Sequence, residues 1–154
     1  MREGIRLGID VGQARVGVAR SDPQGTMAVP VATLARGTAL LEIAHLATEY
    51  GPLEIVVGLP INLQGERTPS TEDAEAFARE IEALGVAPVR MVDERLSTVS
   101  ATSALHSAGR STRSHRSVVD QVAAVILLQH TLDSERSQGV PGGYVLDNPR
   151  AHDE

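Results

Sequence analysis

The first strand predicted from this sequence is strongly hydrophobic, yet a carboxylate lies at its end. Residues 5–11 alternate apolar side chains with other positions, and a second apolar run follows at residues 16–20. The four residues between the runs, 12–15, begin with a glycine, so the two runs predict a β-hairpin. Asp10 lies in the first strand, although aspartate is a poor strand residue and its burial without a partner costs free energy. A carboxylate at this point therefore needs a reason.

The rest of the chain alternates strands with helices. Strands are expected near residues 28–34, 54–60 and 87–94, and helices at 38–51, 70–84, 97–109 and 118–134. A hairpin followed by such an alternation predicts a mixed sheet with helices on its faces. Ser70 or Thr71 is expected to cap the second helix. We expect one domain over residues 1–136, a polar segment at 110–117, and an irregular tail over 137–154 with glycines, prolines and little apolar periodicity.

Composition limits the chemistry that the chain can carry. Its 154 residues are 42% hydrophobic but only 2% aromatic, which fits one domain with an aliphatic core. Because the chain has no cysteine, any metal must bind carboxylates or imidazoles, and these favour Mg²⁺ or Mn²⁺. A net charge of −6 argues against a general nucleic-acid coat, but it allows a local basic patch. No apolar run reaches the roughly 20 residues of a membrane span, so we expect a cytoplasmic protein without a membrane partner.

Acidic residues occupy three ends of predicted elements. Asp10 ends the first strand, Asp93 and Glu94 end the last strand, and Asp120 lies in the first turn of the last helix. Because sites in open α/β sheets form at the carboxyl ends of strands, these side chains are expected to converge. Gathered carboxylates repel one another, and a divalent cation removes that repulsion. Two cations roughly 3.5–4 Å apart can also activate a water for attack on a phosphodiester.

The last helix is suited to bring its acid to the sheet. One of its faces carries an acid, two small residues and a leucine at spacings of three or four: Asp120, Ala123, Ala124 and Leu127. Each acid also has an ordinary structural explanation. A strand-end aspartate beside glycine can be turn chemistry, Asp120 in "SVVD" can complement the helix N-terminus, and Glu94 can form a surface ion pair with Arg95.

Four blocks of sequence, "GIDVGQARVGVA", "VVGLPINLQG", "VDERLST" and "VDQVAAVILLQ", occur in this order within residues 8–129. Together they resemble the YqgF/RuvX family of RuvC-like Holliday junction resolvases and nucleases for precursor 16S rRNA. The resemblance implies an RNase H-like α/β fold, a mixed five-stranded sheet flanked by helices, with a carboxylate-bound Mg²⁺ or Mn²⁺. On the matching positions it implies that Asp10, Glu94 and Asp120 are the catalytic residues and metal ligands. Adjacent strand residues point to opposite faces, so Asp93 is the reserve for Glu94.

Six polar or basic side chains near these blocks are candidates for contacts with nucleic acid: Arg15, Asn62, Arg95, Arg110, Arg113 and Arg116. Arg15, in the turn after Asp10, and Arg95 are candidates to bind phosphate. Asn62 and Gln64 lie on the loop after "GLP", where ordinary loop polarity explains them as well as a contact with nucleic acid does. Arg110, Arg113 and Arg116 form a basic segment before the last predicted helix. This segment could bind phosphates or could be a solvated loop. His115 in that segment is also a candidate acid or base.

The resemblance implies a metal-dependent endonuclease that acts on structured nucleic acid. Its first substrate candidate is the 5′ end of precursor 16S rRNA in ribosome biogenesis. Four-way DNA junctions in recombination and repair are the alternative, and their two symmetric cuts would need a homodimer. A nucleic-acid-binding module without catalysis is a further interpretation. ATP-binding proteins of the actin type also begin with "GIDxG", but they need two domains around the nucleotide, and 154 residues are too few.

Overall fold

The computed structural model describes residues 2–94 and 112–146, and for residues 112–120 it describes only the helical backbone. A single sheet of six strands has the order β3-β2-β1-β4-β5-β6. The strands are β1 (Arg6–Val11), β2 (Arg15–Ser21), β3 (Ala28–Ala35), β4 (Glu54–Leu59), β5 (Val89–Asp93) and β6 (Tyr144–Val145). The helices are η1 (Arg36–Thr38), α1 (Ala39–Tyr50), α2 (Pro69–Ala83) and α4 (Thr112–Gln138). No helix in these described ranges is long and apolar enough to span a membrane.

The sheet is mixed, as predicted. Strand β1 pairs antiparallel with β2 and parallel with β4, and β4 pairs parallel with β5. The expected number of five strands was wrong, because the two-residue strand β6 pairs antiparallel with β5. This strand lies in the segment that we expected to be irregular. It is held by burial of Leu146, whose backbone N–H donates to the Val89 carbonyl at 2.9 Å, and two residues are too few to show strand periodicity.

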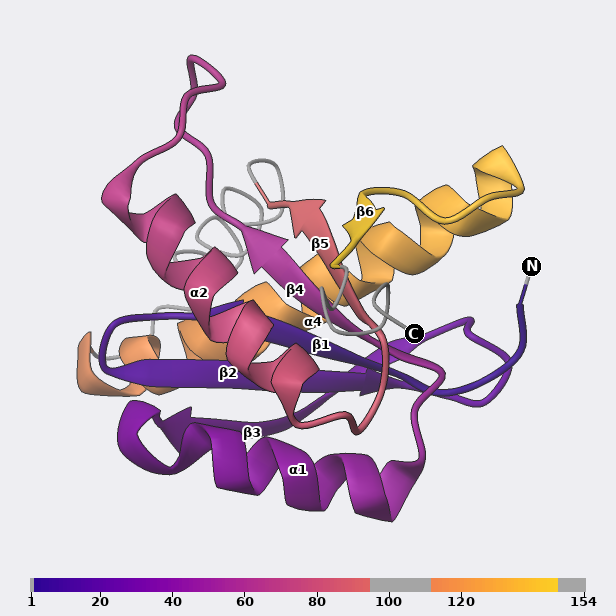
Figure 1. Ribbon diagram of the computed structural model, residues 1–154, viewed down its shortest axis with the longest axis horizontal. Helices are drawn as coiled ribbons and strands as arrows, with labels where there is room; N and C mark the ends of the chain where they lie inside the picture. The colour runs from indigo at the N-terminus through magenta and orange to yellow at the C-terminus, as the bar shows by residue number, and fades with distance from the viewer. Residues whose placement is uncertain (1, 95–111, 147–154) are drawn as a thin grey trace.

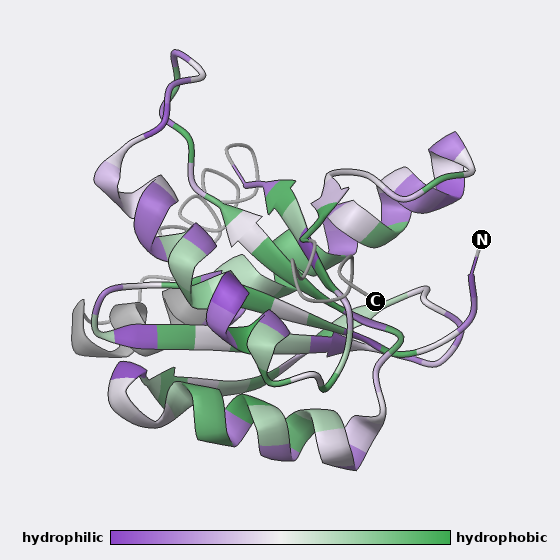
Figure 2. Cartoon of the chain, in the orientation of Figure 1, coloured by the Kyte–Doolittle hydropathy of each residue, from purple (hydrophilic) through white to green (hydrophobic). Residues whose placement is uncertain are grey.

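Helices cover both faces of the sheet (Figure 1). Helices α1 and α2 pack on one face over a core that includes Ile9, Val57 and Phe77. Helix α4 packs on the other face over a smaller core, with Ala19, Val56 and other small or aliphatic side chains. The buried strands between these layers are the most hydrophobic part of the chain, whereas the outer faces of α1 and α2 carry hydrophilic residues (Figure 2).

Two helix starts differ from their predictions. Thr68, and not Ser70 or Thr71, is the N-cap of α2: its hydroxyl accepts from the Thr71 backbone N–H, and Thr71 bonds back in a capping box. Helix α4 begins at Thr112, so much of the polar segment expected at 110–117 is helical. Polar residues give no apolar period, which explains the late predicted start. The helix predicted at 97–109 lies outside the described residues.

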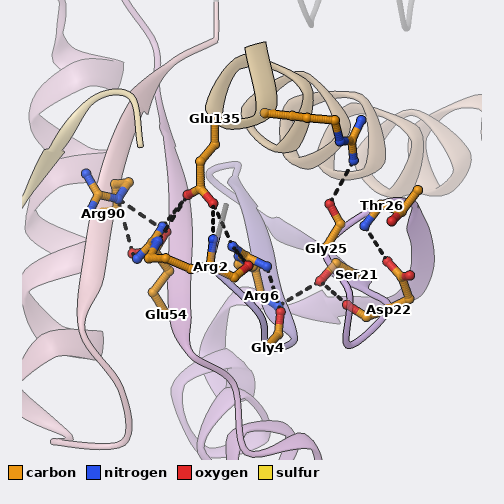
Figure 3. A network of polar contacts seen from close by, with 11 residues as sticks. Arg2, Gly4, Arg6, Ser21, Asp22, Gly25, Thr26, Glu54, Arg90 and Glu135 are labelled. Carbon is orange, nitrogen blue, oxygen red and sulfur yellow. Dashed lines mark hydrogen bonds and ion pairs between the residues drawn. The ribbon is translucent and has the colours of Figure 1, made fainter. Parts of the chain in front are cut away.

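A buried network of charges ties α4 to the amino ends of the parallel strands (Figure 3). Glu135 of α4 accepts hydrogen bonds from Arg2 and from Arg6, which is only 1% exposed, at 2.8 Å. Glu54 of β4 accepts from Arg2 and Arg90. Burial alone would raise the pKa of Glu135, but its arginine partners hold this pKa below its ordinary value. The Glu135 carboxylate is therefore ionised, and the network fixes the C-terminal half of α4 against the sheet.

We predict that Glu135→Gln destabilises the protein by about 3–5 kcal/mol, because it leaves the buried Arg6 without its carboxylate partner. Urea denaturation measures the change in the free energy of unfolding. Arg79→Ala is the control, since Arg79 pairs with Glu75 on an exposed helix surface, and its effect should stay within about 1 kcal/mol. Equal effects of the two substitutions would contradict a structural role for the network.

Candidate active site

Two acidic side chains from different strands meet at the carboxyl edge of the sheet. Asp10 lies near the end of β1, in register with Gly17 of β2. Glu94 directly follows β5, where its backbone N–H donates to the Leu59 carbonyl at 3.3 Å. The side chains of Glu94 and Asp10 are hydrogen-bonded to each other. Strand β4 lies between their strands, so Glu94 must cross β4 to reach Asp10.

A glycine in β4 makes that crossing possible. A Cβ atom placed on Gly58 would collide with the Glu94 carboxyl and would lie 3.1 Å from Leu127 Cδ2 of α4. The Glu94 side chain therefore occupies the space above Gly58, on the sheet face that α4 covers. This contact identifies Glu94, rather than Asp93, as the acid that lies against Asp10. Glycine inside a strand often marks a close approach of this kind, although the sequence analysis did not use that signal.

Helix α4 approaches β1 just as closely. A Cβ atom on Gly8 would lie 2.9 Å from Leu128 Cβ and 3.2 Å from the Ala124 carbonyl oxygen. Gly8 and Asp10 are two residues apart in one strand and thus face the same side of the sheet. The alanine face predicted for this helix is buried, with Ala123 5% and Ala124 0% exposed. Asp10 therefore lies on the face that α4 covers.

The helix register brings the backbone of Asp120 to the same level of the sheet. Gln121 Nε2 donates to Thr33 Oγ1 at 3.0 Å. Thr33 pairs with Gly17, and Gly17 in turn pairs with Asp10. The side chain of Asp120 lies outside the described part of the structure. Among the side chains that are described, no three acidic or histidine residues form a metal-ligating group.

The electrostatics of the pair suit a bound cation. Burial raises the pKa of Glu94 to about 9, and the charge of Asp10, the hydrogen bond to it and the charge of Asp93 all act in the same direction. Without a cation, the pair thus shares a proton at neutral pH. Desolvated carboxylate oxygens held close together are the donors that hard divalent cations prefer, so these residues fit Mg²⁺ or Mn²⁺.

A set of contacts that the sequence analysis missed supports the turn after Asp10. Arg36 Nη1 donates to the Gly12 carbonyl at 2.9 Å, and the guanidinium forms a bidentate ion pair with Asp73 of α2. The same group lies 4.7 Å from the centroid of the Phe77 ring. Hydrogen bonding by Arg36 lowers the pKa of Asp73. Nothing in the spacing of these residues along the chain indicates that they meet.

The predicted nucleic-acid contacts are spread over several elements. Arg15 begins β2, directly after the hairpin turn, and is half-buried. Asn62 uses its side-chain oxygen inside its own loop, where Oδ1 accepts from the backbone N–H groups of Gln64 and Glu66. The remaining predicted side chains lie outside the described part of the structure: Arg95 and Arg110, and, from the first turns of α4, Arg113, His115 and Arg116.

This sheet, with its acid pair at one edge, belongs to the RuvC-like class of RNase H folds. The chain superposes on a Thermus thermophilus RuvC determined in complex with a Holliday junction substrate, with a TM-score of 0.57 and 13% identity over 92% of this chain and 99% of that one. At that identity the likeness concerns the fold alone. The expected RNase H-like α/β fold is thus confirmed.

The chain belongs to the RuvX family, because the family model described as "RuvX: Holliday junction resolvase" matches residues 4–134. A protein of Clavibacter michiganensis named "Putative pre-16S rRNA nuclease" is 52% identical, over 97% of this chain and 96% of its own length. A protein of the same name from Leifsonia xyli is 53% identical, over 96% of this chain and 97% of its own length. The predictions of the YqgF/RuvX family and of a hydrolase acting on phosphodiester bonds are therefore confirmed.

We predict that Glu94→Gln stabilises the cation-free protein increasingly as the pH rises. An unfolded Glu94 loses its proton near 4.5, whereas the folded one keeps it up to about 9, so wild-type stability falls between these values. Glutamine has no such dependence. In EDTA, the difference in unfolding free energy between variant and wild type should grow by about 4 kcal/mol from pH 5 to pH 8. Glu49→Gln, at an exposed position of α1, is the control, and parallel profiles for Glu94→Gln and wild type would contradict the pairing.

We also predict that Gly58→Ala lowers nuclease kcat/KM by about 100-fold or more. The added methyl group displaces the Glu94 carboxyl, and a small displacement in a catalytic site strongly lowers the reaction rate. Gly37→Ala is the matched control, since a Cβ atom there meets nothing within 4 Å. Thermal unfolding of both variants separates displacement from loss of the fold. Wild-type cleavage by a folded Gly58→Ala variant would show that Glu94 need not occupy this position.

Proposed function

We propose that the protein is a divalent-metal-dependent endonuclease that processes the 5′ end of precursor 16S rRNA during ribosome biogenesis in the cytoplasm. The observation that carries this proposal is the hydrogen-bonded pair of Asp10 and Glu94 at the carboxyl edge of the sheet. The choice of RNA as the substrate rests on two relatives, 52% and 53% identical to this chain, that are named "Putative pre-16S rRNA nuclease".

In this proposal Asp10, Glu94 and Asp120 are the catalytic residues and hold Mg²⁺ or Mn²⁺. A bound divalent cation would neutralise the carboxylates and polarise the phosphodiester for hydrolysis. The fold supports the chain's own part of this chemistry. Glu94 is partly buried, Gly58 leaves room for its carboxyl, and the register of α4 supports Asp120 as the third acid.

Six residues are proposed to hold the substrate: Arg15, Asn62, Arg95, Arg110, Arg113 and Arg116. The first lies in the hairpin that carries Asp10, and its turn is closed by a 2.9 Å hydrogen bond from the Gly12 N–H to the Arg15 carbonyl. An arginine there would contact the phosphate backbone beside the cleaved bond. Because phosphate contacts release counterions, substrate affinity should weaken with salt.

Cleavage of four-way DNA junctions is the alternative function, and the description of the matching family model favours it. Two symmetric cuts at a junction require a homodimer. Light scattering of the protein with and without a junction distinguishes the two functions, since a monomer that cleaves RNA would exclude a dimeric resolvase. A module that only binds nucleic acid is disfavoured by the acid pair, because two desolvated carboxyls destabilise a fold that makes no use of them.

The test compares wild type with Asp10→Asn on labelled precursor 16S rRNA and on a four-way DNA junction. We expect wild type to cleave the RNA with Mg²⁺ or Mn²⁺ and not with EDTA, and the variant to lose at least about 100-fold in rate, because it removes a charged group that acts on the reacting phosphate. Asp133→Asn is the control, since Asp133 is an exposed residue of α4. Equal rates for wild type and Asp10→Asn would refute the proposal.

A further inference from the structure

The turn that follows Asp10 is tight, and its first residue has the most flexible backbone of any residue type. A Cβ atom placed on Gly12 would lie 2.7 Å from the Arg15 carbonyl oxygen, so the turn requires glycine there. Glycine also has more backbone freedom than other residues, and the folded protein must remove that freedom. Because Gly12 is two residues beyond Asp10, a loose turn would let the end of β1 shift and carry the carboxyl with it.

Arg36 binds this turn at two points. Its backbone N–H donates to the Ala14 carbonyl at 3.0 Å, and its Nη1 donates to the Gly12 carbonyl at 2.9 Å. The Gly12 N–H donates to the Arg15 carbonyl at 2.9 Å. The carbonyl nearest to Asp10 in this turn is therefore held by the Arg36 side chain, whereas the far side of the turn is held by backbone hydrogen bonds.

Helix α2 fixes the Arg36 guanidinium from two directions. Asp73 accepts hydrogen bonds from Nη1 and Nη2, both at 2.9 Å, and the guanidinium lies 4.7 Å from the centroid of the Phe77 ring. A planar guanidinium can donate to a carboxylate and to a carbonyl while it lies over an aromatic ring, but a lysine ammonium cannot make all of these contacts together. The arrangement therefore requires an arginine and not only a positive charge.

Stability alone does not account for this arrangement. The side chains of Arg36 and Asp73 are 26% and 40% exposed, and ion pairs that water reaches contribute little to the free energy of folding. A bidentate pair does, however, fix the geometry of its two partners. Because Phe77 is buried in the core between α2 and the sheet, the pair fixes the Gly12 carbonyl relative to a rigid part of the fold.

Arg36 and the Asp10 carboxyl belong to opposite faces of the sheet. Helix α2, which holds Arg36, packs on the same face as α1, whereas Asp10 lies on the face that α4 covers. Arg36 thus acts on Asp10 through the backbone of the turn. We propose that Arg36 is a positioning residue, which holds Asp10 where it can bind a divalent cation together with Glu94. This inference rests on the proposed nuclease function.

The test compares Arg36→Lys with Arg79→Lys, the same substitution at an exposed arginine of α2. In titration calorimetry we expect Arg36→Lys to weaken Mg²⁺ binding about tenfold, as for other contacts that orient a metal ligand, and Arg79→Lys to match wild type. In cleavage of precursor 16S rRNA at saturating Mg²⁺, kcat of Arg36→Lys should also fall about tenfold. Its KM should change by less than about threefold, because the backbone N–H of residue 36 still holds the far side of the turn.

Asp73→Asn tests whether α2 is the anchor. This substitution removes the charge that holds the guanidinium but leaves the turn untouched, and it should weaken Mg²⁺ binding in the same direction. The double variant should bind Mg²⁺ within about twofold of Arg36→Lys, because the two residues act through one contact. Independent, multiplying losses in the double variant would overturn the role of α2 as the anchor.

Ile43→Val controls for a general loss of stability, because Ile43 is fully buried in the core. It should lower the melting temperature and leave Mg²⁺ affinity unchanged. Wild-type Mg²⁺ affinity and kcat in Arg36→Lys would overturn the inference, and so would an equal loss of affinity in Ile43→Val. If wild type bound Mg²⁺ but did not cleave, the proposed function would fail and the calorimetry would still decide the role of Arg36. If wild type bound no Mg²⁺, both would fail.

Discussion

The structure depends on the placement of two carboxyl groups, Asp10 and Glu94, next to each other in a partly desolvated place. Such a pair opposes folding, and the surrounding chain is arranged to hold it nevertheless. Gly58 leaves space above β4 for Glu94, and Gly8 allows α4 to cover the same face. In the proposed function, the protein gives up some stability for a site that would bind a cation.

The opposite end of the sheet supplies the stability that this site lacks. There Glu54 and Glu135 are surrounded by three arginines, and Glu135 connects α4 to the start of β1. Helix α4 thus joins a satisfied network at its C-terminal half to the acid pair near its N-terminal half. Because the helix is a rigid element, the network and the hydrogen bond from Gln121 to Thr33 together fix the level of the sheet at which α4 lies.

Sequence patterns predicted the parts of the fold that arise from local periodicity. The hairpin, the buried strand β4, the helices α1 and α2 and the convergence of Asp10 with the end of β5 all follow from apolar spacing and from element ends. Contacts between distant residues were not predictable in this way. The crossing of Glu94 over Gly58, the ion network around Glu135 and the pairing of β6 depend on which side chains meet in space, and no spacing along the chain encodes them.

Binding of Mg²⁺ measured by titration calorimetry tests the central claim most directly. The account predicts that wild type binds Mg²⁺, that Asp10→Asn and Glu94→Gln each weaken binding at least about tenfold, and that Asp93→Asn changes it by less than about threefold, because ligands contribute more than a nearby exposed charge. Wild-type affinity in Asp10→Asn and Glu94→Gln, or no binding by wild type, would contradict it.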